Sequence, residues 1–473
     1  MSDELKLKYH EIDFIVPVHR FNIQFSYVTK QGLSFIREFV LRLVQLAPMK
    51  PTHIATYLGL NKIELNEAIS DLMDKGELQF SELGSVILTP KSEGYFEGLG
   101  KPPKTSSILE TGTTLSFELA GFNCLGKKRI SDKWNLGIAL QISNEIKSTS
   151  EKLAKSVFQK NFYNYFDKEW LNGIRVEGDD RPSIYTMDSV SKLGQDPLRL
   201  TNEFYIDLDG NALEREDFDV LDDSTKSNEL ITTSLSKECE RANIPEIANA
   251  MKLLGDDWTC KFFNNNSIDV SLYAKALSEA QSAGNKPMPI VGPVYSKNNW
   301  GLVIEQLKST IKGFKKSKNQ EIKELLWIAP SDSFWGKSSK LISCLHDLAS
   351  LEISKEKQPQ RIFEPKLFVP LSDMRDRRAL GNWKNDLGKD SKLVFGLLEG
   401  FLSGNVEVFV FSNEFAVINY HISRPEILPV SMPVGFITTD RALVSKINNV
   451  AQEYINGAQS HDKVNNLGLL SKL

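Results

Sequence analysis

Apolar residues recur at helical spacing in three consecutive stretches near the start of the chain. Residues 34–46 show this pattern with few polar interruptions, and prolines then break it. A second, short helix over residues 51–58 leads through a tight turn to a third helix over residues 62–75, with Asn61 as its N-cap. Two short apolar runs within residues 78–88 are separated by a polar segment, which predicts a β-hairpin.

Three helices with a tight turn, followed by a hairpin, resemble the winged helix-turn-helix domains of bacterial transcription regulators and of many DNA-associated proteins. The resemblance rests on residues 54–60, 69–76 and 86–94 and covers roughly residues 30–98. It implies a fold that usually places its third helix in the major groove of DNA.

The charge of the third helix departs from what duplex binding requires. The helix carries Lys62 and Lys75 against four acidic residues, and the hairpin after it has no lysine or arginine. A helix that binds duplex DNA is expected to carry more positive charge. Since winged helices also serve as protein-interaction modules, DNA binding and protein docking both stay open for this unit.

Composition divides the chain into three parts. We predict a winged helix-turn-helix domain over residues 1–100, a mixed α+β middle region with an acidic face over residues 101–285, and an α/β domain with basic clusters over residues 286–473. The segment 99–112 is rich in proline, glycine, serine and threonine, as linkers are.

Within the middle region, the pattern predicts strands at residues 114–124 and 135–142 and a helix at residues 145–166. The aromatic side chains near the end of that helix could stack on bases, but their helical spacing favours a place in the core. A hairpin turned at Asp209 and Gly210 fits the acidic segment there better than a calcium loop, which would need glycine and glutamate at its sixth and twelfth positions.

From residue 286 onward, strands and helices alternate, which indicates an α/β fold. The predicted strands are residues 325–329, 366–369, 406–411, 415–420 and 434–438, and the predicted helices are residues 338–349, 393–401 and 441–456. The fold class of the whole chain is therefore α/β, or mixed α+β when the first two parts are included.

The strand order of this part resembles that of phospholipase D-like phosphodiesterase domains. The resemblance rests on residues 323–330, 406–420 and 433–440. In that family one strand carries a His-x-Lys motif, in which the histidine is the nucleophile and the lysine holds phosphate.

The residues that carry this chemistry in the family are missing here. The expected strand, residues 406–411, has neither histidine nor lysine, and His421 lacks a lysine two positions later. His461 is followed by Lys463, but Gly468 stands where the family has aspartate. The resemblance therefore implies a degenerate domain that binds nucleic acid or a partner without cutting.

A second motif is also incomplete. Gly336, Lys337 and Ser338 follow a buried strand and open a helix, which is the context of a phosphate-binding P-loop. The glycine required five positions before Gly336 is Ser331, and the bulky, acidic loop between them cannot easily form an anion nest. We therefore do not expect nucleotide hydrolysis, although Lys337 at a helix N-terminus could hold one phosphate of a nucleic acid.

The composition excludes several classes of protein. Of the 473 residues, 41% are hydrophobic and 25% are charged, which is ordinary for a globular chain. No apolar stretch approaches the length of a membrane span, and the first residues contain no apolar signal core. The 4 cysteines are far apart and the 6 histidines show no metal-ligand spacing. We expect a cytoplasmic protein with no membrane contact, no metal and no cofactor.

The net charge of −4 hides an asymmetry. Residues 161–230 hold 7 Lys and Arg against 17 Asp and Glu, whereas residues 291–400 hold 19 against 13. Basic clusters can neutralise phosphates, although a single cluster is more often a solvated helix face or loop. The candidate nucleic-acid contacts are Lys312, Lys315, Lys316, Lys318, Lys337, Arg375, Arg377 and Arg378, with Lys127, Lys128 and Arg129 next.

The leading hypothesis is a non-catalytic nucleic-acid-binding component of a larger complex. The two resemblances imply a setting in bacterial DNA processing or antiphage defence, with DNA and a protein complex as partners. One alternative is a protein–protein adaptor that docks through the acidic winged helix and the middle region. The other alternative is a nuclease whose phosphodiesterase site is not visible in the sequence.

Overall fold

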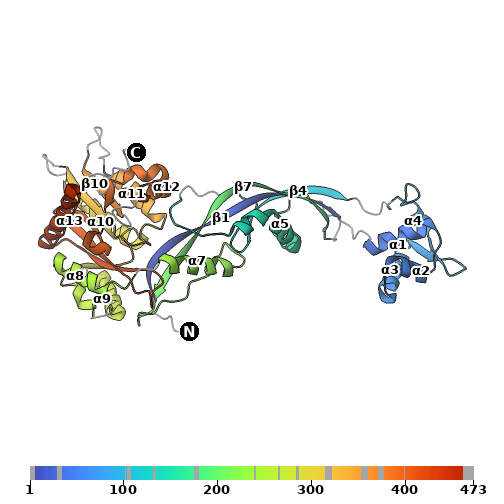
Figure 1. Ribbon diagram of the computed structural model, residues 1–473, viewed down its shortest axis with the longest axis horizontal. Helices are drawn as coiled ribbons and strands as arrows, with labels where there is room; N and C mark the ends of the chain where they lie inside the picture. Colours follow the sequence, from blue (N-terminus) through green and yellow to red (C-terminus); the bar gives the residue numbers. More distant parts are fainter. Residues whose placement is uncertain are drawn as a thin grey trace.

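The computed structural model describes a mixed α/β protein with an elongated arm (Figure 1). The described residues are 6–28, 35–101, 103, 108–130, 135–174, 181–238, 241–264, 267–283, 287–314, 322–352, 361–370, 378–398 and 400–461. In this part of the chain, no helix combines the length and the apolar content needed to cross a membrane.

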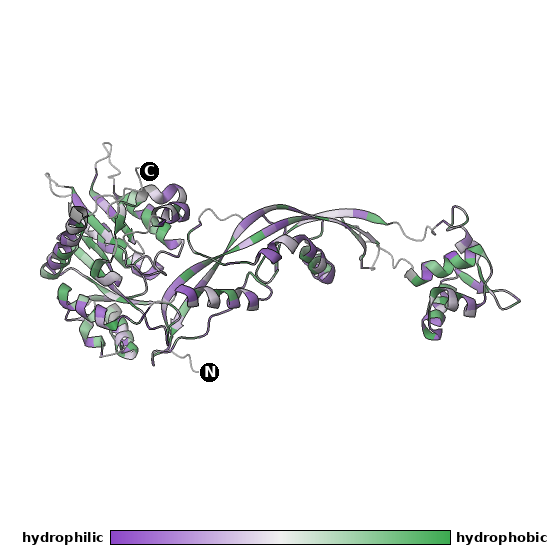
Figure 2. Ribbon diagram, in the orientation of Figure 1, coloured by the Kyte–Doolittle hydropathy of each residue, from purple (hydrophilic) through white to green (hydrophobic). Residues whose placement is uncertain are grey.

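The arm is a sheet built around one long strand. β1 (Leu7–Val28) pairs antiparallel with β7 (Ser183–Ile206) on one side. On its other side it pairs with β4 (Leu109–Glu118) and β6 (Ile138–Ala139), and β5 (Cys124–Gly126) extends the sheet beyond β4. At about 3.3 Å per residue, β1 alone reaches about 70 Å. Figure 2 shows polar and apolar residues alternating along the arm.

The buried positions of β1 change phase along the arm. Near its base the buried hydrophobic side chains are even-numbered, from Ile12 to Val18, and farther out they are odd-numbered, from Phe21 to Tyr27. Because successive side chains of a strand point to opposite sides, the two halves of β1 bury opposite faces of the strand. The change coincides with a register shift against β7 between Arg20 and Phe21.

A small helical unit, residues 35–101, is inserted between β1 and β4; we call it the tip unit. Since Tyr27 pairs with Leu109, the chain enters and leaves the unit at the far end of the arm (Figure 1). The predicted helices and hairpin are present, and their winged-helix identity stays a prediction. The elements are α1 (Phe35–Leu46), α2 (Pro51–Leu58), α3 (Lys62–Asp74), β2 (Leu78–Phe80), β3 (Val86–Leu88) and α4 (Pro90–Glu93).

Two helices, α5 (Asn144–Lys160) and α6 (Phe162–Asp167), cover the far half of the arm. Phe158, Phe162 and Tyr165 are buried against β1 and β4, so the prediction of a core position is confirmed for them, whereas Tyr163 is 46% exposed. The turn predicted at Asp209 and Gly210 is also present, closed by backbone and side-chain hydrogen bonds to Asp207.

The α/β domain has a seven-stranded sheet between two helical layers. The strand order is β11-β10-β9-β12-β13-β14-β8, in which β9, β10 and β11 are parallel and the remaining neighbours are antiparallel. The strands are β8 (Met288–Val291), β9 (Lys323–Ile328), β10 (Phe363–Pro370), β11 (Gly396–Leu398), β12 (Val406–Phe411), β13 (Phe415–Ile422) and β14 (Met432–Thr438).

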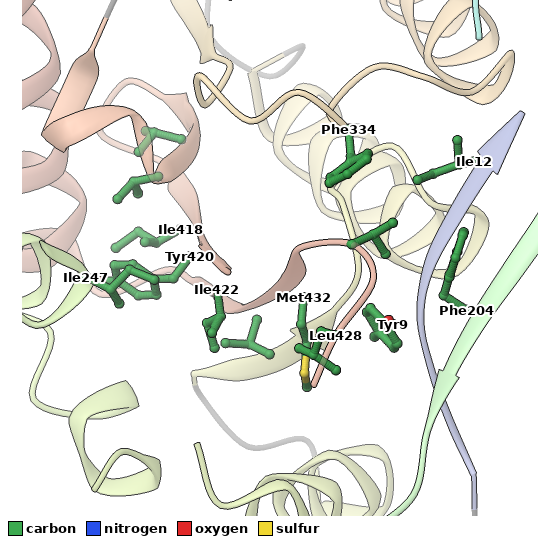
Figure 3. Close-up of a cluster of buried hydrophobic side chains, with 14 of the residues drawn as sticks. Tyr9, Ile12, Phe204, Ile247, Phe334, Ile418, Tyr420, Ile422, Leu428 and Met432 are labelled. Atoms are coloured by element: carbon green, nitrogen blue, oxygen red, sulfur yellow. The ribbon is translucent and has the colours of Figure 1, made fainter. Parts of the chain in front are cut away.

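Each face of this sheet has its own layer of helices. One face packs against α10 (Lys297–Phe314), α11 (Lys340–Leu351) and α12 (Ala379–Leu387). The other face packs against α8 (Ile244–Leu254), α9 (Val270–Ala283) and α13 (Arg441–His461), and this core continues through β1 toward α7 (Thr225–Glu238). Figure 3 shows Tyr9, Ile12 and Phe204 of the arm beside Phe334, Leu428 and Met432 of the domain.

One predicted helix is wrong. Residues 393–401 contain the strand β11, flanked by the 3-10 turns Gly388–Leu393 and Phe401–Gly404. Phe368 and its neighbours in β10 pair with Gly396–Leu398, which are buried, so strand pairing determines the conformation of this short apolar run. Gly400 then adopts a φ of 67°, a left-handed conformation that favours glycine.

Candidate functional site

Polar side chains gather at one edge of the seven-stranded sheet. Asp332 follows the carboxyl end of β9, Glu407 lies near the start of β12, and His421 lies near the end of β13. Because β12 is antiparallel to both β9 and β13, these positions meet at the same edge. The carboxyl ends of parallel strands are where open α/β sheets usually hold their ligands, so this edge is the candidate functional site.

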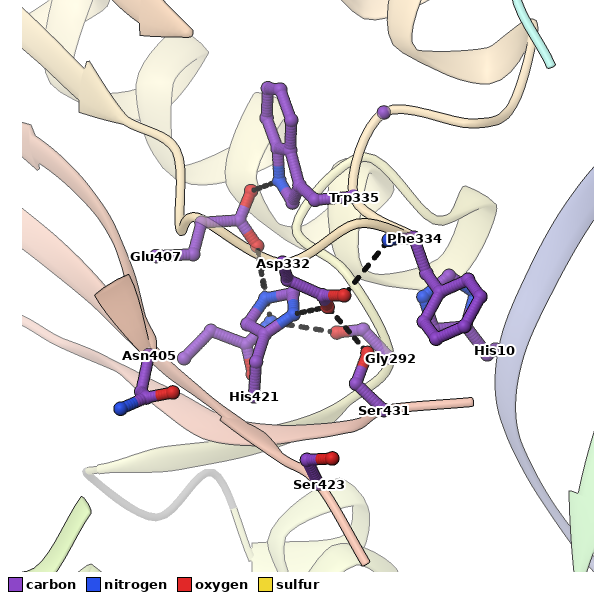
Figure 4. Close-up of polar contacts among 12 residues, drawn as sticks. His10, Gly292, Asp332, Phe334, Trp335, Asn405, Glu407, His421, Ser423 and Ser431 are labelled. Atoms are coloured by element: carbon purple, nitrogen blue, oxygen red, sulfur yellow. Dashed lines mark hydrogen bonds and ion pairs between the residues drawn. The ribbon is translucent and has the colours of Figure 1, made fainter. Parts of the chain in front are cut away.

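His421 lies between two carboxylates (Figure 4). Its Nδ1 is 2.6 Å from Oδ2 of Asp332, and its Nε2 is 3.5 Å from Oε2 of Glu407. His421 is 1% exposed and Glu407 is 0% exposed. Ser431 donates a further hydrogen bond to Asp332. We call His421, Asp332 and Glu407 the charged cluster.

Glu407 accepts hydrogen bonds from several elements of the domain. The indole nitrogens of Trp327 and Trp335 donate to Oε1 over 2.9 and 2.8 Å. The backbone amide of Val294 and the side-chain amide of Asn419 donate to Oε2 over 3.1 and 3.3 Å. The carboxylate is thereby satisfied without water, as a buried charge requires.

The ionisation of the cluster follows from these contacts. Burial would lower the pKa of His421, but its hydrogen bonds to Asp332 and Glu407 raise that pKa to about 9. Burial would likewise raise the pKa of both carboxyl groups, but the hydrogen bonds and the charge of His421 keep each below its ordinary value. At neutral pH the cluster therefore contains one imidazolium between two carboxylates.

The base of the arm covers this edge of the sheet. Asp13 of β1 accepts hydrogen bonds from the guanidinium of Arg199 over 2.8 Å and from the backbone amide of Ser339 over 2.7 Å. The backbone amide of Asp13 also donates to the carbonyl of Lys337 over 2.8 Å. The loop between β9 and α11, which holds Asp332 and Trp335, is thus fixed between β1 and the cluster. The sequence did not predict that this loop acts as a P-loop, and in the structure its side chains bind other protein groups.

The geometry favours a structural role for the charged cluster. All three residues are almost fully buried and each has a protein partner. Among the residues whose structure is described, no group of three or more His, Cys, Asp or Glu side chains is arranged to hold a metal ion. Its hydrogen bonds join β9, β12 and β13 to the three loops that hold Asp332, Val294 and Ser431.

No family model, curated protein or solved structure matches the chain. The two family resemblances therefore stay predictions.

Three of the predicted phosphate contacts are already engaged within the protein. Lys127 donates to the carbonyl of Glu169 over 2.7 Å. Arg129 pairs with Asp196 over 3.0 Å. Lys337 is partly buried and lies 3.5 Å from a carboxylate oxygen of Asp386 in α12, with its ammonium over the ring of Trp383. Phosphate binding by these side chains would have to compete with internal partners.

The other predicted residues do not form one surface. Lys128 is exposed beside β5 in the arm, whereas Lys312 and Arg378 are exposed in the α/β domain. Lys312 lies near the end of α10, which precedes the start of β9, whereas Arg378 follows the end of β10. Because β9 and β10 are parallel, the start of one and the end of the other lie at opposite edges of the sheet. Outside the described residues lie Lys315, Lys316, Lys318, Arg375 and Arg377.

The charged cluster was not predicted from the sequence. His421 was considered only as an incomplete phosphodiesterase motif, and Asp332 only as a residue that spoils a P-loop. The available signal was polar residues at alternate positions in otherwise apolar strands: Asn419 and His421 in one strand, and Glu407 in its neighbour. Glu407 and Asn419 are register partners, which places the polar side chains together.

Proposed function

We propose that this protein is a non-catalytic adaptor that docks a protein partner through the tip unit, at the end of an arm anchored in the α/β domain. The observation that carries the proposal is the surface of the tip unit. Of the 14 exposed large hydrophobic side chains in the described residues, 6 belong to this unit: Leu46, Tyr57, Ile63, Phe80, Leu83 and Leu99. The tip unit thus holds a large share of the exposed apolar side chains in a small part of the chain, and apolar side chains gathered in one region mark interaction sites.

Three of these side chains lie on α2, on α3 and in the hairpin. Tyr57 at the end of α2 is 73% exposed, Ile63 in the first turn of α3 is 78% exposed, and Leu83 in the hairpin is 87% exposed. The first turn of α3 is held in place by a capping box between Asn61 and Glu64. Apolar side chains on well-ordered elements can bind a partner at low conformational cost.

The charges of the tip unit also favour a protein partner. The unit contains 7 Lys and Arg against 9 Asp and Glu. Arg37 and Lys75 are both paired with Asp71, at 3.0 and 2.9 Å. A nucleic-acid surface needs cations that face solvent. The unit therefore fits a partner whose surface is apolar and basic.

The arm gives this docking surface its reach. β1 is continuous from the far end of the sheet to the base of the α/β domain, where Asp13 holds the loop before α11. The partner would be bound tens of ångströms from that domain. This is the layout of a connector between two components of an assembly.

Nucleic-acid association is the second candidate. The exposed positions of Lys128 and Lys312 favour it, since neither lysine forms an ion pair with another residue in the described part of the chain. Their placement on separate surfaces makes it the weaker proposal. A nuclease function has no further support in the geometry of the charged cluster.

The proposal is tested by site-specific photo-crosslinking in the native host. A photoreactive amino acid replaces Tyr57 or Ile63, and Leu253 of α8, which is 60% exposed, serves as the matched control site. We expect the same crosslinked protein from both tip positions and not from Leu253, and we expect Ile63→Asp to abolish its co-purification. A partner captured equally at all three sites would contradict the proposal.

A salt series separates the two candidates. Purified protein is titrated with labelled duplex and single-stranded DNA, with and without magnesium, and the products are examined on a gel. Binding that weakens steeply with salt and is lost in Lys312→Ala, but not in Ile63→Asp, would favour the nucleic-acid candidate over the adaptor. Cleavage that depends on magnesium would support the nuclease alternative.

A further inference from the structure

The outward face of α5 carries an excess of lysine. The helix contains 4 lysines and 2 glutamates. Its buried residues, Ser150, Ala154 and Phe158, face the arm, and the lysines occupy exposed positions around the rest of the helix. None of the four has an ion-pair or side-chain hydrogen-bond partner among the residues whose structure is described. They are Lys147, Lys152, Lys155 and Lys160.

The two glutamates of α5 do not neutralise these lysines. Glu151 lies one turn from both Lys147 and Lys155, which is the spacing of helical ion pairs. Its carboxylate instead accepts a hydrogen bond from the backbone amide of Lys192 in β7 over 2.9 Å. Glu145 lies in the first turn of the helix, where a carboxylate complements the helix dipole. The outward face therefore keeps its positive charge.

The neighbouring strand adds to this charge. Lys192 is exposed, and its ammonium lies 2.7 Å from Nε2 of His19 in β1, so its partner is an imidazole. Burial lowers the pKa of His19, and the charges of Lys192 and Lys147 lower that pKa further. The charge of Lys147 thus acts on a residue of the adjoining strand, as an unneutralised charge does.

The four lysines extend along most of the helix. Between Lys147 and Lys160 the helix rises by about 20 Å. This is the length of about six nucleotides of one strand of a duplex. Ser156 and Gln159 are also exposed there, and such side chains donate hydrogen bonds to phosphate oxygens. The helix lies beside the arm, between the tip unit and the α/β domain (Figure 1).

We propose that the outward face of α5 binds the phosphate backbone of a nucleic-acid duplex. The contacts are made by Lys147, Lys152, Lys155 and Lys160. A convex helix fits the outside of a duplex, whereas single strands are usually held in grooves with aromatic side chains. Backbone contacts carry no sequence information, so we expect binding without sequence preference. This inference does not rest on the adaptor function, because the tip unit takes no part in it.

The test is fluorescence anisotropy of the full-length protein with a labelled DNA duplex and with its single strand, from about 50 to 200 mM salt. The test variant is Lys152→Ala/Lys155→Ala. The matched control is Lys308→Ala/Lys312→Ala, which removes the same charge from exposed positions of α10. Because alanine favours helices, both variants should fold, and their unfolding midpoints check this. Unlabelled polyglutamate serves as a competitor that imitates an acidic protein.

We expect the duplex to bind in a salt-dependent manner and more tightly than the single strand. Lys152→Ala/Lys155→Ala should weaken duplex binding at least about tenfold and reduce the slope of log K against log salt by about 2. The α10 variant should bind like the unmodified protein, and Lys152→Arg/Lys155→Arg should retain binding. No duplex binding at the lowest salt, equal losses in the two alanine variants, or tighter binding of the single strand would overturn the proposal. Competition by polyglutamate as strong as that by unlabelled duplex would also overturn it, in favour of an acidic protein partner.

Discussion

Replacing Glu407 with glutamine tests whether the charged cluster holds the α/β domain together. The substitution keeps the shape of the side chain but removes its charge. Glutamine keeps one oxygen for the indoles of Trp327 and Trp335, whereas its amide nitrogen would face the donors of Val294, Asn419 and His421. Three donors that now meet a carboxylate oxygen would meet another donor.

The expected cost can be estimated from these contacts. Breaking a fully buried ion pair from one side typically costs about 3 to 5 kcal/mol, because the remaining charge stays buried without its partner. We therefore expect Glu407→Gln to lower the free energy of unfolding of the α/β domain by about 3 to 5 kcal/mol. The matched control is Glu414→Gln, in which the partly exposed ion pair with Lys323 is lost. That change should cost less than about 1 kcal/mol.

Urea unfolding followed by tryptophan fluorescence measures both variants. Trp327 and Trp335 contact Glu407 directly, so their emission reports on the region that the substitution perturbs. A midpoint for Glu407→Gln that is no lower than that for Glu414→Gln would refute the reasoning. The cluster would then contribute no more than a surface ion pair.

Three further predictions follow from the same contacts. The folded-state pKa of His421 is raised to about 9, so the stability that it contributes is complete below about pH 6.5 and is lost as the pH rises to 9. Burial lowers the pKa of His10 to about 4, so the stability of the protein falls as the pH falls from about 6.5 toward 4. Urea midpoints measured from about pH 4 to 9.5 should therefore peak near pH 6.5, and a flat profile would contradict both assignments. Asp13→Asn should cost about 3 kcal/mol and speed amide hydrogen exchange in the loop before α11, since it removes the buried partner of Arg199; unchanged exchange there would show that β1 does not hold this loop. Asn61→Ala should destabilise the tip unit by about 1 kcal/mol, seen as faster exchange in α3 alone, because its side chain caps two backbone amides of that helix.

Much of the local structure could be predicted from periodicity. The helices of the tip unit have one apolar face each. The strands Val406–Phe411 and Phe415–Ile422 are mostly apolar and are buried along their whole length, because both of their faces are covered. The long strand β1 was missed although its apolar residues alternate. The alternation changes phase after Val18, where the strand passes from one core to the next, and an interrupted period is hard to recognise along a sequence.

The candidate site was harder to predict because it depends on partners far apart in the chain. His421 meets Asp332 across 89 positions and Glu407 across 14, and Asp13 of β1 meets Ser339 across 326. Residues 393–401 show the same limit. Their composition fits a short helix, and pairing with β10 determines that three of them form a strand.

The arm also constrains the order in which the chain can fold during synthesis. β1 is made first, but its longest partner ends at Ile206, and the loop that receives Asp13 follows residue 330. The tip unit, whose contacts are local, can fold while β1 still has an open edge. Contacts of such long sequence separation form slowly, and an unpaired strand edge invites pairing with other chains. We therefore expect the nascent N-terminal strand to be the segment of this protein that most needs a chaperone.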